Sequence, residues 1–393
     1  MLSSPRSRRQ FLRLSVVGSA SAGLLAACGT AAAPAGPSEA GASAPTSPPS
    51  TSVAGQAGAA SKTSTGSPSL AASGTSAPLA PPVTLNIGSN QSLAESGMYI
   101  AFDRGYFRDE GLNVNFQVGG PLETIFPLLT RGDLDAAQGG ITPAIFNAVS
   151  RNVGVRIVTA SVVNLPGRSL YFMARKELVD SGQLKAPRDL KGRTWSAPGG
   201  ISIVRLEIEN ALKTAGLTFS DIKTVNLGYP EAVAALANKG IDLAFMIEPL
   251  AAQSVEKGIA VRYIDAGAQA LHYPASIYVY GTKMLQQPEV GRRFMLALLR
   301  GVRDYENAAS KNQGRQEAIA SMIKHTSVKD ASLYDKIVWQ WEPTNGEIFP
   351  DKVQELVDYF KANNQFEQPP DLSKVLDQQF TQYALQQLGP YQS

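Results

Sequence analysis

The pattern of apolar positions is most informative between residues 95 and 120, where it changes from helical to alternating. Four apolar residues with near-helical spacing follow a polar opening, and Gly105 can end that helix because glycine adopts the left-handed conformation without strain. Alternation over residues 112–118 then predicts a strand that stops at Gly119-Gly120. A second helix is predicted from Pro121. We expect this unit to open a ligand-binding domain.

The same order of strand, loop and helix continues through most of the chain. Val83–Gly88 alternates and predicts the first strand. Further strands are predicted from apolar runs at residues 134–137, 155–163, 169–174, 193–197, 222–227, 242–247, 261–264 and 276–280. This alternation is typical of an α/β protein with parallel sheets. From Pro288 the pattern is helical to the end of the chain, so two strand-and-helix sets and a helical tail predict two lobes.

Loops at the carboxyl ends of these strands form the expected ligand site, because open α/β sheets bind ligands there. Several loops also place backbone N–H groups at the start of a helix, which suits an anion or a polar group. We expect the ligand-binding residues to be Asn90, Gln91, Glu95, Tyr99, Gly119, Gly120, Gly140, Thr142, Asn164, Gly199, Gly200, Ser202, Tyr229 and Glu248.

Each of these residues also has a purely structural interpretation. The glycines either let a ligand approach closely or only form turns. Thr142 and Ser202 either donate to a ligand or cap their own helices. Tyr99 and Tyr229 either stack on a flat ligand or lie in the core. Glu248 suits the positive end of the following helix, and it could instead accept hydrogen bonds from a ligand amino group.

The N-terminal stretch from Met1 to Pro82 has the composition of an export signal followed by a disordered tether. Residues 7–13 resemble the twin-arginine export signal, and the apolar region 14–27 is too short to span a bilayer. It ends at Cys28 in a sequence that resembles a bacterial lipobox, in which the cysteine carries a diacylglycerol; the alternative is an ordinary signal peptide with a chance cysteine. Residues 29–82 are almost entirely Ala, Gly, Pro, Ser and Thr, and we expect a disordered tether that leaves the folded part anchored to a membrane outside the cytoplasm.

Composition argues against several other classes of site. The chain carries a formal charge of +3, but removing the four arginines that precede Cys28 leaves −1, so charge gives no argument for nucleic acid. Cys28 is the single cysteine, which excludes an internal disulfide and a cysteine-rich metal site. The two histidines, His272 and His325, are far apart in sequence, so we expect no metal, no cofactor and no catalytic pair. We expect a monomer without enzymatic activity.

Short motifs recur in an order that resembles periplasmic solute-binding proteins of the nitrate, sulfonate and taurine type, a group that also contains binders of thiamine pyrimidine precursors. The motifs are GYFRDEGLNV at 105–114, the pair Gly119-Gly120, RGDLD at 131–135, RDLKGR at 188–193, and KGID at 239–242 ahead of Glu248-Pro249. Each motif is weak alone, but the ordered set is specific, and the resemblance covers roughly residues 83–388.

The resemblance implies a type II periplasmic-binding fold, in which two crossover segments join two α/β lobes and a small solute binds between them. Crossovers are then expected near residues 167–174 and 271–278. The first lobe would comprise residues 83–172 and 276–393, and the second lobe would comprise residues 173–275. Arg168 would lie beside the first crossover, either paired with an anion or solvated at the surface. The implied partners are the permease and the ATPase of an ABC importer, which would recognise the closed form.

The class of solute stays open. The glycine loops supply N–H groups for an anion, but they carry no arginine cluster, and Glu248 would repel an anion. This favours an organic solute with an amine or an aromatic ring. Two other functions are compatible with the resemblance: a ligand-sensing module for a separate signalling partner, and a pyrimidine-forming enzyme of the same fold. The enzyme requires a cysteine-rich segment, which a chain with Cys28 alone does not have.

Overall fold

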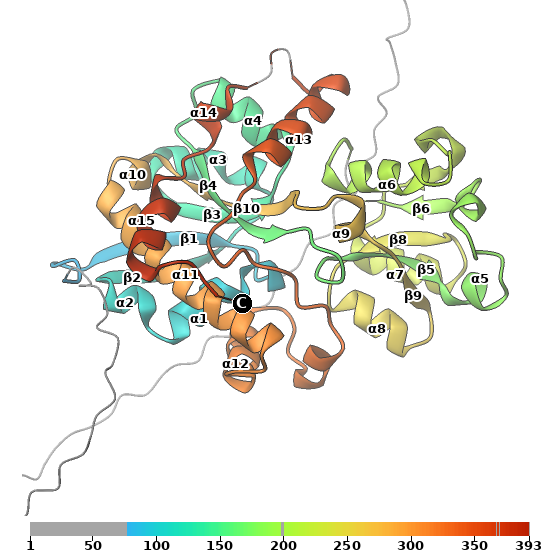
Figure 1. Ribbon diagram of the computed structural model, residues 1–393, viewed down its shortest axis with the longest axis horizontal. Coiled ribbons are helices and arrows are strands. Elements are labelled where there is room, and N and C mark those ends of the chain that lie inside the picture. The colour runs from blue at the N-terminus through green and yellow to red at the C-terminus, as the bar shows by residue number, and fades with distance from the viewer. Residues whose placement is uncertain (1–76, 198–199, 367, 369, 393) are drawn as a thin grey trace, which may run out of the picture. The chain divides into compact units, whose positions relative to one another are not determined.

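The computed structural model describes residues 77–392 apart from 198, 199, 367 and 369, and it contains two five-stranded sheets (Figure 1). The first sheet has the order β2-β1-β3-β10-β4 and the second the order β7-β6-β8-β5-β9. The strands of the first are β1 (Val83–Ser89), β2 (Leu112–Val118), β3 (Ala136–Gly140), β4 (Arg156–Val163) and β10 (Pro274–Tyr280). The strands of the second are β5 (Tyr171–Arg175), β6 (Thr194–Ser196), β7 (Lys223–Val225), β8 (Leu243–Met246) and β9 (Ala260–Asp265). The predicted two-lobe α/β fold is confirmed.

Helices cover each sheet, and we call the first sheet with its helices lobe 1 and the second lobe 2. The helices of lobe 1 are α1 (Ser96–Asp103), α2 (Tyr106–Asp109), α3 (Leu122–Arg131), α4 (Pro143–Ser150), α10 (Thr282–Leu285), α11 (Pro288–Ser310), α12 (Arg315–His325), α13 (Pro350–Ala362), α14 (Leu372–Val375) and α15 (Gln379–Leu388), with the 3-10 turns η1 (Leu93–Glu95) and η4 (Ala331–Asp335). Those of lobe 2 are α5 (Lys176–Asp180), α6 (Ile203–Lys213), α7 (Tyr229–Ala237) and α8 (Leu250–Glu256), with η2 (Pro187–Leu190) and η3 (Phe219–Asp221).

Each sheet contains one antiparallel strand, whereas the sequence pattern predicted parallel sheets. β10 runs antiparallel to β3 and β4, and β5 runs antiparallel to β8 and β9. Both strands are the first that the chain forms after it crosses from the other lobe. The crossovers leave at the carboxyl ends of β4 and β9, so the chain enters the next sheet at its carboxyl edge and must run in the opposite direction.

The crossovers lie a few residues earlier in the chain than the expected segments 167–174 and 271–278. The first comprises residues 164–170, and the second comprises residues 266–273, including α9 (Ala266–Gln269). The expected boundary after residue 172 falls inside β5, because Phe172 pairs with Phe245 and Ile264 of the second sheet. The expected start of the second part of lobe 1 at residue 276 likewise falls inside β10, which begins at Pro274.

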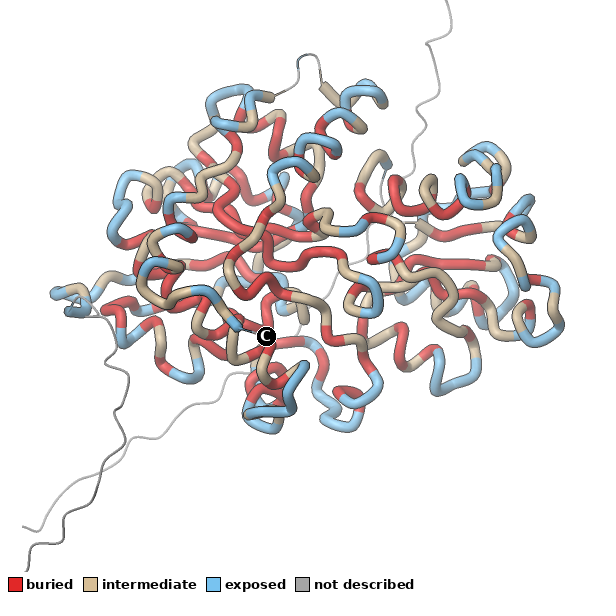
Figure 2. Tube along the Cα trace, viewed as in Figure 1, coloured by how far each residue is buried: buried red, intermediate tan, exposed pale blue. Residues whose placement is uncertain are grey.

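Lobe 1 is a three-layer sandwich with an apolar core on each face of its sheet. Alternate residues of β10 point to opposite faces, so Ile277 packs with α3, α4 and α13, whereas Tyr278 packs with α1, α11 and α15. Figure 2 shows the buried residues along the strands and the exposed residues on the outer turns of the helices. Lobe 2 has smaller clusters on its two faces, built around Trp195 and Met246.

Helices α1 and α11 meet at two glycines. A Cβ atom on Gly301 would lie 2.2 Å from the carbonyl oxygen of Gly97 and 2.6 Å from the backbone nitrogen of Ala101. A Cβ atom on Gly97 would lie 2.8 Å from the Cα atom of Val302. The backbones therefore approach so closely that neither position has room for a side chain.

The pattern from Pro288 predicted a tail that is helical throughout. This prediction was wrong for one segment. Residues 336–349 contain neither helix nor strand in the structure. Their backbone groups have distant partners instead: Trp341 donates its N–H to Arg168 and accepts a hydrogen bond from Val163. These contacts hold the segment extended beside the first crossover.

The twin-arginine signal, Cys28 and nearly all of the predicted tether lie outside the described residues. Within the part of the chain that the structure describes, none of the helices has the length and apolar character needed to cross a bilayer. The same part holds no group of three or more His, Cys, Asp or Glu side chains suited to a metal ion.

Candidate functional site

The carboxyl edges of both sheets border the junction between the lobes. The first crossover leaves lobe 1 at the end of β4, and the second leaves lobe 2 at the end of β9 (Figure 1). The remaining parallel strands of each sheet end at the same edge. The loops that follow them are therefore the surfaces that a ligand between the lobes would meet.

In lobe 1, six predicted residues lie along this edge. Asn90 follows β1, the pair Gly119-Gly120 follows β2, Gly140 ends β3, Thr142 precedes α4 and Asn164 follows β4. Asn90 and Gly140 are exposed, and a Cβ atom on Gly140 would meet nothing within 4 Å. The structure thus brings these positions together at one edge, and their contact with a ligand stays a prediction.

In lobe 2, four predicted positions follow the strand ends in the same way. Gly200 and Ser202 lie between β6 and α6, Tyr229 begins α7 and Glu248 follows β8. Gly200 is exposed with open space around it, and Tyr229 is half-buried. Gly199 lies outside the described residues.

The two hydroxyls that precede helices differ in what they contact. Ser202 Oγ accepts a weak hydrogen bond of 3.5 Å from the N–H of Arg205, so it caps α6. Thr142 Oγ1 is buried without a hydrogen-bond partner among the described residues, and it makes no cap contact with α4. Of the two, Ser202 is thus the hydroxyl that its own helix already engages, and ligand contact by Thr142 stays a prediction.

Glu95 folds the loop after β1 rather than facing the junction. Its side chain is buried, and Oε2 accepts hydrogen bonds from the Tyr99 hydroxyl at 2.8 Å, the Ser92 N–H at 3.1 Å and the Asn90 N–H at 3.2 Å. Burial raises the pKa of Glu95 above its ordinary value, although these hydrogen bonds oppose the change. Glu95 and Tyr99 are therefore already engaged within lobe 1, whereas Gln91 is exposed beside them.

A pocket of about 110 Å³ opens beside this loop, lined by Ser89, Gln91, Tyr99, Phe116, Gln117, Val118, Lys324 and His325. The His325 ring stacks on Tyr99 with centroids 5.0 Å apart, and its Nε2 lies 3.0 Å from Asp103 Oδ1. Two predicted residues, Gln91 and Tyr99, line the pocket, whereas Phe116 and His325 were not predicted. The combination of aromatic rings and amide side chains suits a flat organic group with polar atoms.

Glu248 has protein partners for both carboxylate oxygens. Oε1 accepts hydrogen bonds from Arg262 Nη2 at 2.9 Å and the Val338 N–H at 3.2 Å, and Oε2 accepts from the Ala252 N–H at 3.0 Å. Its side chain is only 3% exposed. A ligand amino group would therefore reach Glu248 only in competition with Arg262.

Asn164 joins the first crossover to α6 of lobe 2. Its Nδ2 donates to Glu207 Oε1 at 2.7 Å, and both residues are buried. Glu207 Oε2 is buried without a hydrogen-bond partner among the described residues. Burial raises the pKa of Glu207 to about 8, the Asn164 hydrogen bond opposes the change, and the charge of Asp265 adds to it. Near neutral pH Glu207 is thus mainly protonated.

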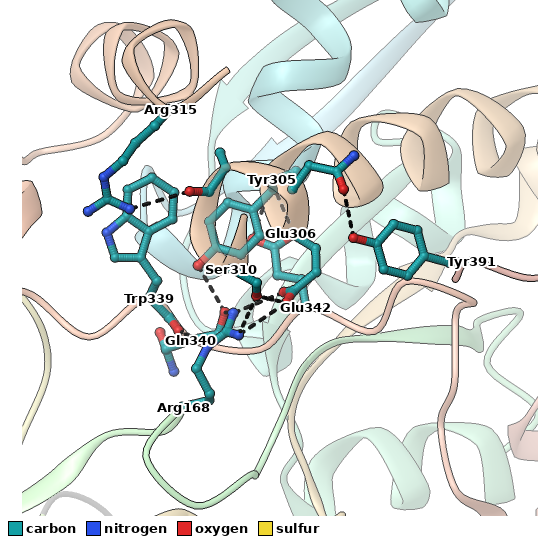
Figure 3. A network of polar contacts seen from close by, with 12 residues as sticks. Arg168, Tyr305, Glu306, Ser310, Arg315, Trp339, Gln340, Glu342 and Tyr391 are labelled. Atoms are coloured by element: carbon teal, nitrogen blue, oxygen red, sulfur yellow. Dashed lines mark hydrogen bonds and ion pairs between the residues drawn. The ribbon is translucent and has the colours of Figure 1, made fainter. Parts of the chain in front are cut away.

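Arg168 is neither a free anion site nor a solvated residue. It forms a two-pronged ion pair with Glu306 of α11, with N–O distances of 2.9 and 3.1 Å (Figure 3). Its Nε donates to the carbonyl of Trp339 at 2.6 Å, and Nη1 donates to Ser310 Oγ at 3.2 Å. Arg168 therefore fixes the first crossover to lobe 1.

Comparison with known proteins shows which family the chain belongs to. The model of the family described as NMT1/THI5 like matches residues 94–308, which is more than half of the chain. The chain belongs to the NMT1/THI5-like family. The predicted relationship to solute-binding proteins is confirmed by this match. Among curated proteins, the riboflavin-binding protein RibY of Chloroflexus aurantiacus is 26% identical to this NMT1/THI5-like chain over 248 residues, which cover 60% of the chain and 67% of RibY.

Solved structures of solute-binding proteins share the fold of this NMT1/THI5-like protein. The aliphatic sulphonate-binding protein SsuA of Escherichia coli superposes with a TM-score of 0.60 and 20% identity, over 76% of this chain and 99% of SsuA. The nitrate-binding protein NrtA of Synechocystis PCC 6803 gives a TM-score of 0.59 and 14% identity, over 80% of this chain and 90% of NrtA. The periplasmic-binding-protein fold predicted from the motifs is confirmed.

The fold does not by itself separate binding from catalysis. The desulfurization enzyme DSZB superposes with a TM-score of 0.57 and 14% identity, over 78% of this chain and 99% of the enzyme. The residues at the junction, rather than the fold, therefore determine which of the two a chain performs.

Proposed function

We propose that this NMT1/THI5-like protein captures a small organic solute between its lobes and delivers it to the permease of an ABC importer. The main observation in support is that the carboxyl edges of both sheets, with the loops that follow their strands, border the junction between the lobes. Within the described residues, only the two short crossovers carry the chain across this junction. Ligand binding at such a junction closes the lobes and excludes water, and a permease can then distinguish the loaded from the empty form.

The paired charges near the junction favour a neutral solute over a bare anion. Arg168 is paired with Glu306, Arg262 with Glu248 and Lys324 with Asp103. An anion would have to compete with a carboxylate for each of these three cations. The aromatic and amide residues of the pocket beside Gln91 instead offer stacking and neutral hydrogen bonds.

The first prediction concerns ligand-induced stability. One solute from a panel of nitrate, taurine, aryl sulfonates, aminopyrimidines, riboflavin and aromatic carboxylates is expected to raise the midpoint of thermal unfolding. A ligand at ~100 times its Kd adds about 2.7 kcal/mol to the free energy of unfolding, and each kcal/mol corresponds to about 2–4 °C in a domain of 150–250 residues. Planar heterocycles should exceed nitrate, and chemical turnover of the stabilising solute would refute a role in binding alone.

We also propose that a lipid on Cys28 anchors the protein outside the cytoplasm and that residues 29–82 tether the folded part to it. Two acyl chains hold a protein on a membrane stably, whereas one chain does so only marginally. A Cys28→Ala variant is expected to move from the membrane fraction to the soluble fraction, with unchanged solute affinity. Fractionation followed by immunoblotting checks this, and a variant that stays on the membrane contradicts the lipid anchor.

A further inference from the structure

Residues Lys336–Trp339 form a contact between the lobes that is separate from the two crossovers and from the apolar packing of α6 with lobe 1. The segment follows η4 and belongs by packing to lobe 1. The Trp339 ring stacks on Tyr305 with centroids 5.4 Å apart, and its Nε1–H donates to the carbonyl of Tyr334 at 2.9 Å. The guanidinium carbon of Arg315 lies 4.3 Å from the centre of the same ring. Buried aromatic contacts therefore hold this end of the segment on lobe 1.

The other side of the segment faces β9 and α8 of lobe 2. Arg262 Nη2 donates to the carbonyl of Lys336 at 2.8 Å and, within lobe 2, to Glu248 Oε1 at 2.9 Å. The Val338 N–H donates to the same Glu248 oxygen at 3.2 Å. Lys336 Nζ forms an ion pair with Glu256 at the end of α8. The polar contacts of Lys336 and Val338 thus join a short stretch of lobe 1 to one corner of lobe 2.

Apolar packing across this contact is small. Of the buried residues in the cluster that contains Ile337 and Trp339, only Ala252 comes from lobe 2, and the others belong to α1, α11, α12 and the tail. The segment is consequently attached to lobe 1 by aromatic and apolar burial and to lobe 2 mainly by charged hydrogen bonds. Rotation of lobe 2 would break the charged contacts and leave the aromatic ones intact.

We propose that Glu248 and Arg262, together with Lys336–Trp339, form a latch that holds the lobes together and must break before they separate. Glu248 is then a positioning residue that acts through Arg262 and Val338, not through a ligand. The latch lies beside the hinge, because Arg168 in the first crossover donates to the carbonyl of Trp339. Its effect on solute release rests on the proposed function, whereas its effect on the lobes themselves does not.

Because the ion pair is largely buried, the loss of either charge should weaken the latch. The Glu248 side chain is 3% exposed and that of Arg262 is 25% exposed, so water screens the pair weakly. Replacing one charged partner leaves the other partly buried without its counter-charge. A Glu248→Gln change keeps the size of the side chain, removes the charge and turns one acceptor oxygen into an NH2 donor. It therefore weakens the polar contacts to Arg262, Val338 and Ala252 while the apolar packing persists.

The test compares the ligand-free parent with E248Q, with Arg262→Lys, and with the control E177Q. Glu177 pairs with Lys239 on the surface of lobe 2, so its substitution removes an ion pair away from the latch. Hydrogen exchange of the Val338 amide and the radius of gyration from X-ray scattering are measured. We expect exchange about 10- to 100-fold faster in both latch variants, a larger radius, and no change in E177Q.

Two results would overturn the proposal. The first is parent-like exchange and radius in both E248Q and Arg262→Lys. The second is a parent-like ligand-free protein in which E248Q alone weakens solute binding, because that result would make Glu248 a ligand contact. Failure to find any solute would leave these ligand-free measurements unaffected, so the latch and the proposed function fail separately.

Discussion

A Gly301→Ala variant is expected to unfold at a clearly lower denaturant concentration than the parent. Alanine is the better helix former by about 1 kcal/mol. The added Cβ atom, however, would lie 2.2 Å from the Gly97 carbonyl oxygen and 2.6 Å from the Ala101 nitrogen, both backbone atoms that cannot turn aside. Forcing α1 and α11 apart costs about 1–3 kcal/mol or more, and the Gly97 N–H also loses its alignment with buried Glu342. We expect a net loss of about 2 kcal/mol.

Gly140→Ala provides the matched control for this experiment. Its Cβ atom would meet nothing within 4 Å, and the residue is exposed at the end of β3. Stability should therefore stay within about 0.5 kcal/mol of the parent. Urea unfolding followed by circular dichroism measures both variants. Equal midpoints for Gly301→Ala and the parent would mean that the helices can separate at no cost.

Stability is also expected to fall as pH rises from about 5 to 8, with Glu207 as a main cause. Burial raises the pKa of this carboxyl from the usual 4.5 to about 8 in the folded protein. Below pH 4.5 both states are protonated. Between the two pKa values the folded state keeps a proton that the unfolded state has released, so the free energy of unfolding decreases by about 1.4 kcal/mol per pH unit. Above pH 8 this contribution stops changing.

A Glu207→Gln variant should remove that part of the pH dependence. Its side-chain oxygen can still accept the hydrogen bond from Asn164, so the variant is expected to resemble the parent at pH 5 and to exceed it at pH 8 by up to about 4 kcal/mol. Burial also raises the pKa values of Glu95 and Glu342, so a smaller slope remains. Unfolding midpoints at several pH values between 5 and 8, with exposed Glu231→Gln as control, check this. Parallel curves for parent and E207Q would contradict it.

The fold was largely predictable because short stretches of sequence mark most of its strands and turns. Apolar runs marked the strands closely, and glycine and proline marked many turns. The direction of β5 and β10 was not predicted, because it follows from where the chain re-enters a sheet. The extended segment 336–349 was missed for a related reason, since distant partners such as Val163 and Arg168 satisfy its backbone.

The candidate site was predicted as a set of positions, not as a set of contacts. The rule that loops follow strand ends placed Asn164 and Glu248 after β4 and β8, where the structure has them. Their partners, Glu207 and Arg262, lie on other elements, and no local pattern assigns one charged side chain to another. From the sequence, His325 was weighed only as a metal ligand or a catalytic residue. Its stacking on Tyr99 was not predicted, because that contact joins two helices that are far apart in sequence.

The place of β10 between β3 and β4 has a consequence for how the protein is made. Lobe 2 comprises one continuous stretch and can fold as soon as residue 265 has left the ribosome. Lobe 1 cannot close its sheet until residues 274–280 arrive, so β3 and β4 are left without their shared neighbour during the intervening synthesis. Unpaired strand edges of this kind attract other chains. The part of lobe 1 that is translated first is therefore the last to be completed, and it needs protection for longest.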